Sequence, residues 1–187
     1  MKKLFLFVFA GIFISACSNS GNKVSTPAQP VDKNEIVITN DLENALAKIP
    51  SWNNEITVFD KKDMAHSGGF VCITNDTLEF SYTYNEKFKN INDRVPKRVI
   101  YSGWVYTSIA NPKFSIICGL NDNGKQYDWN SYPLEKELPE AGKWVEFIST
   151  FYFTDKPLKP EHDVKLYAWN QSKKPVYMDD LKITFVY

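Results

Sequence analysis

The sequence contains little of the chemistry that most enzymes need. It has only two histidines, His66 and His162, and no Gly-x-Ser-x-Gly motif, histidine pair or glycine-rich phosphate loop. Acidic residues are plentiful, so a glycosidase carboxylate pair stays open on residue type alone. A domain of this size whose strands form its core leaves little room for a deep active site, and we expect a protein that is not an enzyme.

An excess of either charge is also missing. The chain has 22 basic and 22 acidic side chains, and removal of Lys2 and Lys3 with a leader would leave it nearly neutral. Proteins that bind nucleic acids usually carry a basic stripe. We therefore expect no nucleic-acid partner.

No apolar run is long enough to span a membrane comfortably. Two lysines, an apolar run from Leu4 to Ile14 and small residues before Cys17 are typical of a signal peptide, residues 1–16. The tetrad Ile-Ser-Ala-Cys at 14–17 is similar to the lipobox of bacterial lipoproteins. This resemblance implies that Cys17 is acylated by fatty acids such as palmitate and anchors the chain to the lipid bilayer; an ordinary secretory signal is the alternative.

The segment after Cys17 has almost nothing to bury. Residues 17–34 are rich in Ser, Asn, Pro and Lys, a composition that favours a disordered tether. By resemblance to lipoprotein sorting rules, Ser18 favours the outer membrane of the bacterial cell envelope, with the side of the membrane left open.

Cysteine is scarce as well. Cys72 and Cys118 are the only cysteines besides Cys17, and both lie in apolar runs typical of strands. In an exported protein they could form a disulfide or remain two buried free thiols, and the sequence leaves both open.

The remaining residues, 35–187, predict a single all-β domain. About ten short runs rich in β-branched and aromatic residues alternate with turn clusters, as in RVIYSGWVY and KFSIICGL. This pattern favours a two-sheet antiparallel β-sandwich of the jelly-roll type. The one helical candidate, DLENALAKI at 41–49, ends before Pro50 and could be a single turn or irregular coil.

Several fragments in order along the chain resemble one superfamily. They are NDLEN, IPSWNNE, MAHSGGFVCI, YSGWVY, EAGKWVEFISTFYF and the final VYMDDLKITFVY. Together, from Thr39 to Tyr187, they look like the carbohydrate-binding jelly rolls of the galactose-binding-like superfamily.

The resemblance implies a structural calcium ion near the two ends of the domain. Its ligands would be Glu43, the main-chain carbonyls of Ser67 and Gly68, and Asp179, with Asp180 as the fallback. Calcium prefers six to eight oxygen ligands of this kind. Alternation with Leu181 and Ile183 places Asp179 on the inward side of the last strand. Alternatively, Asp179 accepts backbone N–H groups in a metal-free turn.

Sugar binding depends on exposed aromatic rings beside hydrogen-bonding side chains. Five residues in loops or at strand ends fit this description: Trp129, Asn130, Tyr132, Trp169 and Asn170. Aromatic residues are also enriched in ordinary strands. We interpret Trp104 and Trp144 as packing residues and Trp52 as a lid over the sandwich edge.

These observations predict a membrane-anchored lipoprotein whose non-catalytic domain binds glycan or cell-envelope polysaccharide. The alternative is a structural or assembly lipoprotein that contacts another envelope protein without binding sugar. A hydrolase is a third, less favoured reading.

Overall fold

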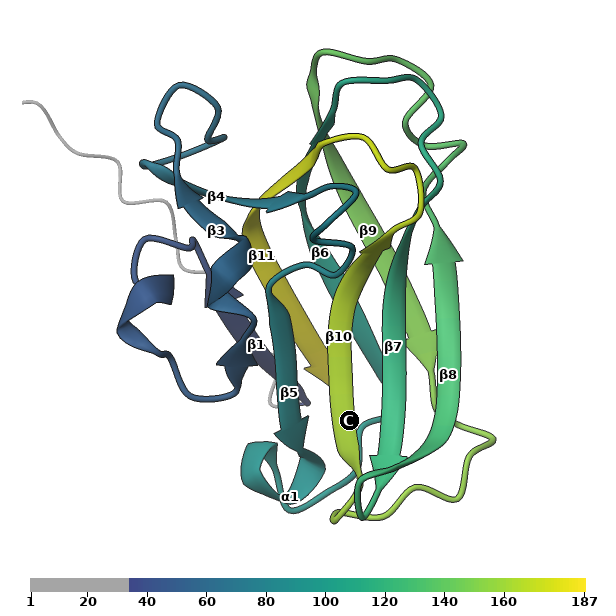
Figure 1. Cartoon of the computed structure of the whole chain (residues 1–187). Helices are drawn as coiled ribbons and strands as arrows, with labels where there is room; N and C mark the ends of the chain where they lie inside the picture. Colours follow the sequence, from purple (N-terminus) through teal and green to yellow (C-terminus); the bar gives the residue numbers. More distant parts are fainter. Residues whose placement is uncertain (1–33) are drawn as a thin grey trace, which may run out of the picture. The chain divides into compact units, whose positions relative to one another are not determined.

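The computed structural model describes residues 34–187, and the predicted signal peptide, Cys17 and most of the tether lie outside this range. Nearly every element is a strand (Figure 1). The strands are β1 (Glu35–Asn40), β2 (Trp52–Asn53), β3 (Val58–Asp60), β4 (Phe70–Thr74), β5 (Thr83–Lys87), β6 (Arg98–Thr107), β7 (Phe114–Asp122), β8 (Lys125–Pro133), β9 (Trp144–Tyr152), β10 (Asp163–Asn170) and β11 (Val176–Val186).

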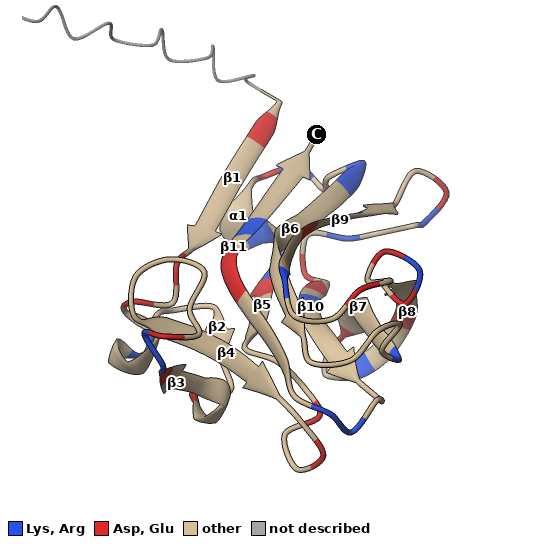
Figure 2. Ribbon diagram, turned by 90° about the horizontal axis from the view of Figure 1, so that it is seen from above, with Lys and Arg blue, Asp and Glu red and all other residues tan. Residues whose placement is uncertain are grey.

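The strands form two antiparallel sheets that lie face to face (Figure 2). The six-stranded sheet has the order β3-β4-β11-β6-β9, and β1 pairs with β11 beside β4. The five-stranded sheet has the order β2-β5-β10-β7-β8. The predicted two-sheet antiparallel β-sandwich is confirmed.

The core lies between the sheets because alternate residues of each strand face inward. Along β6, buried and part-exposed residues alternate without a break. On β10, Val164, Leu166 and Ala168 are fully buried and point into the same core. The outward residues of the same strand, Lys165, Tyr167 and Trp169, are therefore free to form a surface.

The free thiols of Cys72 and Cys118 lie in this core. Cys72 is on β4 of one sheet and Cys118 is on β7 of the other. Of the two possibilities left open by the sequence, the structure therefore has two buried thiols.

The short elements of the domain agree only in part with the sequence patterns. The helical candidate at 41–49 forms a single 3-10 turn, Ala45–Ala47, after Leu42 adopts a positive φ of 67°, and a single turn is one of the outcomes that the sequence left open. One of the strand-like runs in the sequence, TLEFSYTY at 77–84, forms a strand only from Thr83. A short helix, α1 (Phe88–Ile91), follows β5 and was not expected from the sequence. Short segments are decided by packing more than by local propensity.

A β-bulge interrupts β11. The register with β6 shifts between Asp179 and Lys182, and Asp180 has a φ of 49°. Before the bulge Met178 is buried, and after it Leu181 and Ile183 are buried, so the alternation changes phase. Asp179 pairs with Trp104, whose side chain lies on the outer face of the sheet.

Asp179 therefore does not lie on the inward side of β11, and that prediction is wrong, although Asp179 is buried as expected. The side chain has no exposed surface, but it is covered from outside by the turn around His66 rather than placed between the sheets. The extra residue of a bulge reverses which face the following residues occupy.

Candidate functional site

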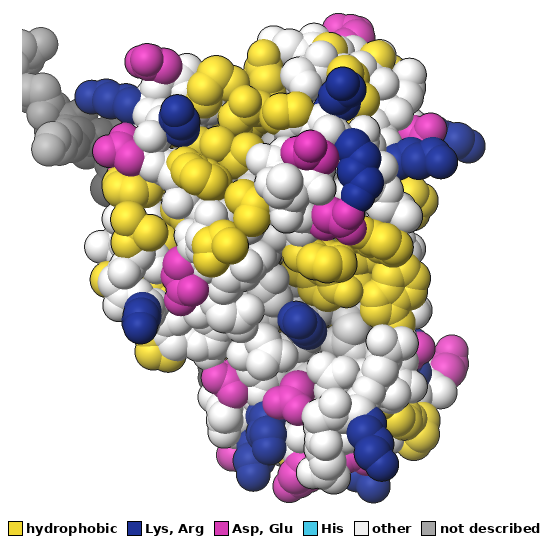
Figure 3. Space-filling model, viewed as in Figure 1, with side chains coloured by type: hydrophobic (Ala, Val, Ile, Leu, Met, Phe, Trp, Pro, Cys, Tyr) yellow, Lys and Arg dark blue, Asp and Glu magenta, His cyan; other side chains and the backbone are white. Residues whose placement is uncertain are grey.

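Four aromatic side chains contact one another on the outer face of the five-stranded sheet, and we call them the aromatic face. Phe80 and Trp129 are 47% and 39% exposed. The Phe80 ring lies 5.7 Å from that of Tyr167 and 6.2 Å from that of Trp169, and Trp129 lies 6.3 Å from Trp169. Figure 3 shows hydrophobic side chains gathered over β10, β7 and β8.

Strand register brings these rings together from distant parts of the sequence. Tyr167 and Trp169 alternate along β10 on its outward side. Trp129 on β8 is opposite Gly119 of β7, which is opposite Lys165 of β10. Because glycine has no side chain, the indole of Trp129 can extend over β7 toward β10. Phe80 precedes β5 and is held beside Trp169 by an isolated bridge.

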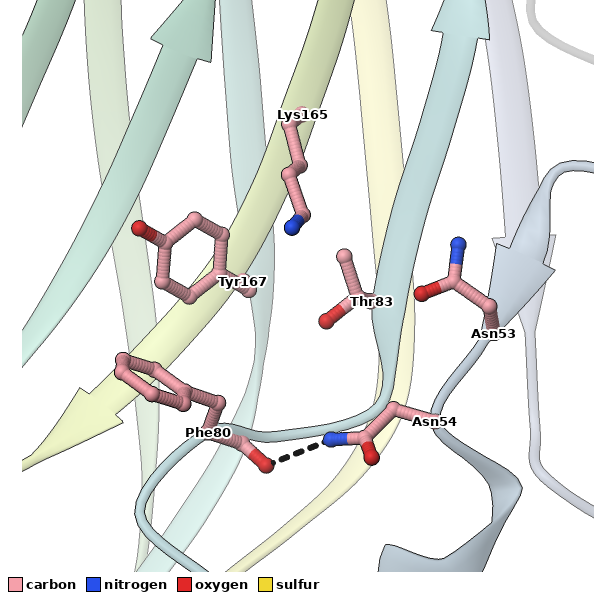
Figure 4. Close-up of a pocket in the computed structure, with 6 residues that line it drawn as sticks. All are labelled: Asn53, Asn54, Phe80, Thr83, Lys165 and Tyr167. Carbon is pink, nitrogen blue, oxygen red and sulfur yellow. Dashed lines mark hydrogen bonds between the residues drawn. The ribbon is translucent and has the colours of Figure 1, made fainter.

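A pocket of about 390 Å³ adjoins the aromatic face between β2, β5 and β10 (Figure 4). Its lining is formed by Asn53, Asn54, Phe80, Thr83, Lys165 and Tyr167. Aromatic and polar side chains thus share one surface, which is the arrangement that sugar rings and their hydroxyl groups require.

Several polar groups in the pocket remain available to a ligand. The Asn54 amide N–H donates to the carbonyls of Phe80 and Ser81, at 2.8 and 3.0 Å, which leaves its oxygen as an acceptor. The Thr83 hydroxyl donates to the Ser81 carbonyl at 2.8 Å and can still accept. The Tyr167 hydroxyl accepts from Nε1 of Trp129 and can still donate.

The structure brings together only two of the five predicted sugar-binding residues, Trp129 and Trp169. Tyr132 packs against the core and donates its hydroxyl to Glu137, and the Asn130 amide bonds to Asp128. Asn170 has no exposed surface. Its amide donates to Thr74 and to the Lys174 carbonyl and accepts from Ser172, so it holds the turn after β10.

The sequence patterns did not predict Phe80, Tyr167 and Lys165 as part of this face. The alternation in DVKLYAW does indicate that Lys165, Tyr167 and Trp169 share a face, because the residues between them are apolar. No comparable signal exists for Phe80, which lies outside the named strands and reaches the site through the tertiary fold.

The predicted calcium site is a turn fastened by two carboxylates. Oδ2 of Asp179 accepts the backbone N–H groups of His66 and Ser67, at 2.9 and 3.1 Å. Oε1 of Glu43 accepts those of Gly69 and Phe70, at 2.8 and 3.0 Å. Both carboxylates thus accept hydrogen bonds from N–H groups of the turn. These N–H groups are donors and cannot ligate a cation.

Asp180 binds the same turn through side chains. Its carboxylate accepts from the Ser67 hydroxyl at 2.7 Å and lies 2.6 Å from Nδ1 of His66. The His66 ring stacks on Trp104 at 4.1 Å and meets Trp144 edge to face at 5.4 Å. Trp104 and Trp144 are therefore packing residues, and they pack against the turn around His66 on the outer side of the six-stranded sheet.

The electrostatics of the two acids differ. Burial raises the pKa of Asp179 to about 6, against the lowering effect of the Ser67 and other N–H donors. The N–H groups of Gly69 and Phe70 lower the pKa of Glu43.

Within residues 34–187, no group of three or more His, Cys, Asp or Glu residues is arranged to hold a metal ion. The donor set observed here matches the metal-free alternative, and calcium stays a prediction.

Trp52 has a structural position. It is 5% exposed and stacks on Tyr82 at a distance of 5.2 Å between ring centroids.

In the described part of the chain, no helix is long and apolar enough to cross a membrane.

No protein-family model matches the sequence, and no curated protein matches it significantly. Solved structures of carbohydrate-binding modules share the β-sandwich. A Paenibacillus barcinonensis family 22 xylan-binding domain is 16% identical with a TM-score of 0.46, covering 80% of this chain and 99% of its own. A family 15 xylan-binding module is 17% identical with a TM-score of 0.47, covering 81% and 97%.

A third neighbour is larger. The structure of the CBM22-1 and GH10 modules of Clostridium thermocellum endo-1,4-beta-D-xylanase 10B, complexed with xylohexaose, is 14% identical with a TM-score of 0.48. The match covers 72% of this chain but only 26% of that one. Likeness at this level says nothing about what this chain binds.

Proposed function

We propose that this chain is a non-catalytic glycan-binding protein that holds polysaccharide on the outer face of its five-stranded sheet. One observation carries the proposal: the aromatic face lies beside a pocket whose side chains offer hydrogen-bond donors and acceptors. Sugar rings have C–H faces that pack on aromatic rings and hydroxyl groups that need polar partners. A purely apolar patch would instead favour a protein partner.

Binding at this face needs little rearrangement. The Trp129–Tyr167 hydrogen bond and the ring contacts between Phe80, Tyr167 and Trp169 hold the aromatic side chains in place. Groups that are ordered before binding lose less conformational entropy when a ligand arrives. The polysaccharide would therefore meet a preformed surface.

A polysaccharide-retention assay, by affinity electrophoresis of the full chain in detergent, tests the proposal. We expect Trp129→Ala and Phe80→Ala each to weaken binding by about tenfold or more, as for aromatic anchors of other interfaces. Tyr152→Ala is the matched control, since Tyr152 is 61% exposed but belongs to β9 of the other sheet. Equal binding by all variants, or no binding to any glycan, would reject the proposal.

We also propose that Cys17 carries the lipid that anchors the protein to the bacterial outer membrane. Support comes from the sequence alone: the leader, the Ile-Ser-Ala-Cys tetrad and Ser18. Two or three acyl chains on one residue give stable anchoring, whereas a single chain is marginal. Metabolic labelling with palmitate should mark the wild-type protein and not Cys17→Ser, and unlabelled wild type would contradict the proposal.

A further inference from the structure

We infer that the glycan held on the aromatic face is acidic, and that a carboxylate or sulfate group of the sugar binds Lys165. This inference rests on the proposed function and specifies its ligand. It arises from the position of one lysine at the centre of an otherwise uncharged pocket.

Lys165 projects from the middle of the five-stranded sheet. On β10 it is paired with Asn85 of β5 and with Gly119 of β7. Its ammonium lies 5.5 Å from the centre of the Tyr167 ring, and its side chain points into the pocket beside Thr83 (Figure 4). The charge thus lies next to the rings on which a sugar would stack.

The charge of Lys165 is not neutralised by the protein. Two other lysines near this sheet form ion pairs, Lys156 with Asp128 and Lys173 with Glu79. Within residues 34–187, Lys165 forms no ion pair, and the six residues that line the pocket include no carboxylate. The ammonium makes a cation–π contact with the Tyr167 ring, which attracts a cation weakly while water remains.

Ligand binding would change this balance. A sugar that packs on Tyr167 and Phe80 covers the pocket and removes water from the ammonium. Loss of hydration is costly unless an opposite charge replaces it, and a neutral hydroxyl compensates less than a carboxylate or sulfate. An anionic sugar should therefore bind more tightly at this position than a neutral sugar.

The other side chains that line the pocket are uncharged, so they do not favour either an acidic or a neutral sugar. Asn53, Asn54 and Thr83 are neutral and suit hydroxyl groups. Preference between acidic and neutral polysaccharides should therefore depend on Lys165, whereas affinity common to both should depend on the aromatic face.

Matched polysaccharides test the inference with the full chain in detergent. We would measure binding to polygalacturonate and to its carboxyl-reduced form, and to dextran sulfate and dextran. We expect the acidic member of at least one pair to bind about tenfold more tightly, and this preference to decrease as salt increases. Preference in the first pair identifies a carboxylate, and preference in the second identifies a sulfate.

Three variants complete the experiment. Lys165→Gln should abolish the preference, and Lys165→Arg should retain most of it. Lys182→Gln, on exposed β11 surface of the other sheet, should leave it unchanged. Equal binding to acidic and neutral glycans, unaffected by Lys165→Gln, would overturn the inference and leave the proposed function standing. Absence of binding to every polysaccharide would overturn both.

Discussion

The indole Nε1 of Trp129 donates a hydrogen bond to the Tyr167 hydroxyl, 3.3 Å away, and so joins β8 to β10 across the outer surface of β7. The bond fixes the orientation of the Trp129 ring. It also leaves the Tyr167 hydroxyl proton free for a ligand.

Tyr167→Phe removes the acceptor of the Trp129 N–H and the donor that is free for a ligand. It should therefore weaken glycan binding by about fivefold or more, the equivalent of at least one neutral hydrogen bond of ~1 kcal/mol. The thermal midpoint should change little, because the ring keeps its packing and the Trp129–Tyr167 bond is exposed to solvent. Tyr106→Phe, on the outer face of the other sheet, is the control for loss of a tyrosine hydroxyl. Wild-type affinity in Tyr167→Phe would show that this hydroxyl is not part of the site.

Asn170 should contribute to stability and not to binding. Asn170→Ala leaves partners of a fully buried amide unsatisfied, which should cost on the order of 2–3 kcal/mol in urea unfolding. Asn130→Ala should cost much less, because within residues 34–187 the Asn130 side chain has a single hydrogen bond, to Asp128. If folded Asn170→Ala bound glycan more weakly, with Trp129 and Trp169 intact, Asn170 would have to be counted as part of the binding site.

Gly68 should be intolerant of substitution. A Cβ there would overlap Oε1 of Glu43, and φ is +58°. The Glu43 carboxylate would have to move away from the Gly69 and Phe70 N–H groups that it accepts. Gly68→Ala should therefore lower the free energy of unfolding by about 2 kcal/mol, against about 1 kcal/mol for Gly124→Ala. Gly124 is the matched control because its φ is +78° and its Cβ would meet nothing within 4 Å. Similar losses in both variants would argue against the close Glu43 contact.

Asp179 should be needed for stability whether or not calcium is bound. Asp179→Ala leaves the N–H groups of His66 and Ser67 without their acceptor, which should cost on the order of 2 kcal/mol in urea unfolding. A thermal melt with chelator then separates the two models of the turn. Bound calcium predicts a lower midpoint in chelator that excess calcium restores, whereas a turn held by hydrogen bonds alone predicts no change.

The two core cysteines should be unreactive while the protein is folded. Burial raises the pKa of Cys72 to about 11 and that of Cys118 to about 12, so neither forms a thiolate at neutral pH. A thiol assay on the Cys17→Ser chain should detect no thiol in buffer and two in denaturant. Absence of thiols in denaturant would reveal a disulfide instead.

Much of the fold follows from the sequence because alternation of buried and exposed residues is a local property. It correctly predicted the all-β class, the long strands β6 and β7, and two buried cysteines as one of two possibilities. The alternation gave the wrong side of the strand for Asp179. The sequence pattern continues through this residue, but in the sheet a bulge reverses which side the residues face.

The sequence by itself determined which residues could form strands and that Trp129 and Trp169 end up near hydrogen-bonding groups. Only the tertiary structure decided that Phe80, Tyr167 and Lys165 join them and that Asn130, Tyr132 and Asn170 do not. The reason is physical: a binding face is made by strands that are distant in sequence, and their order and register in the sheet are set by packing of the whole core.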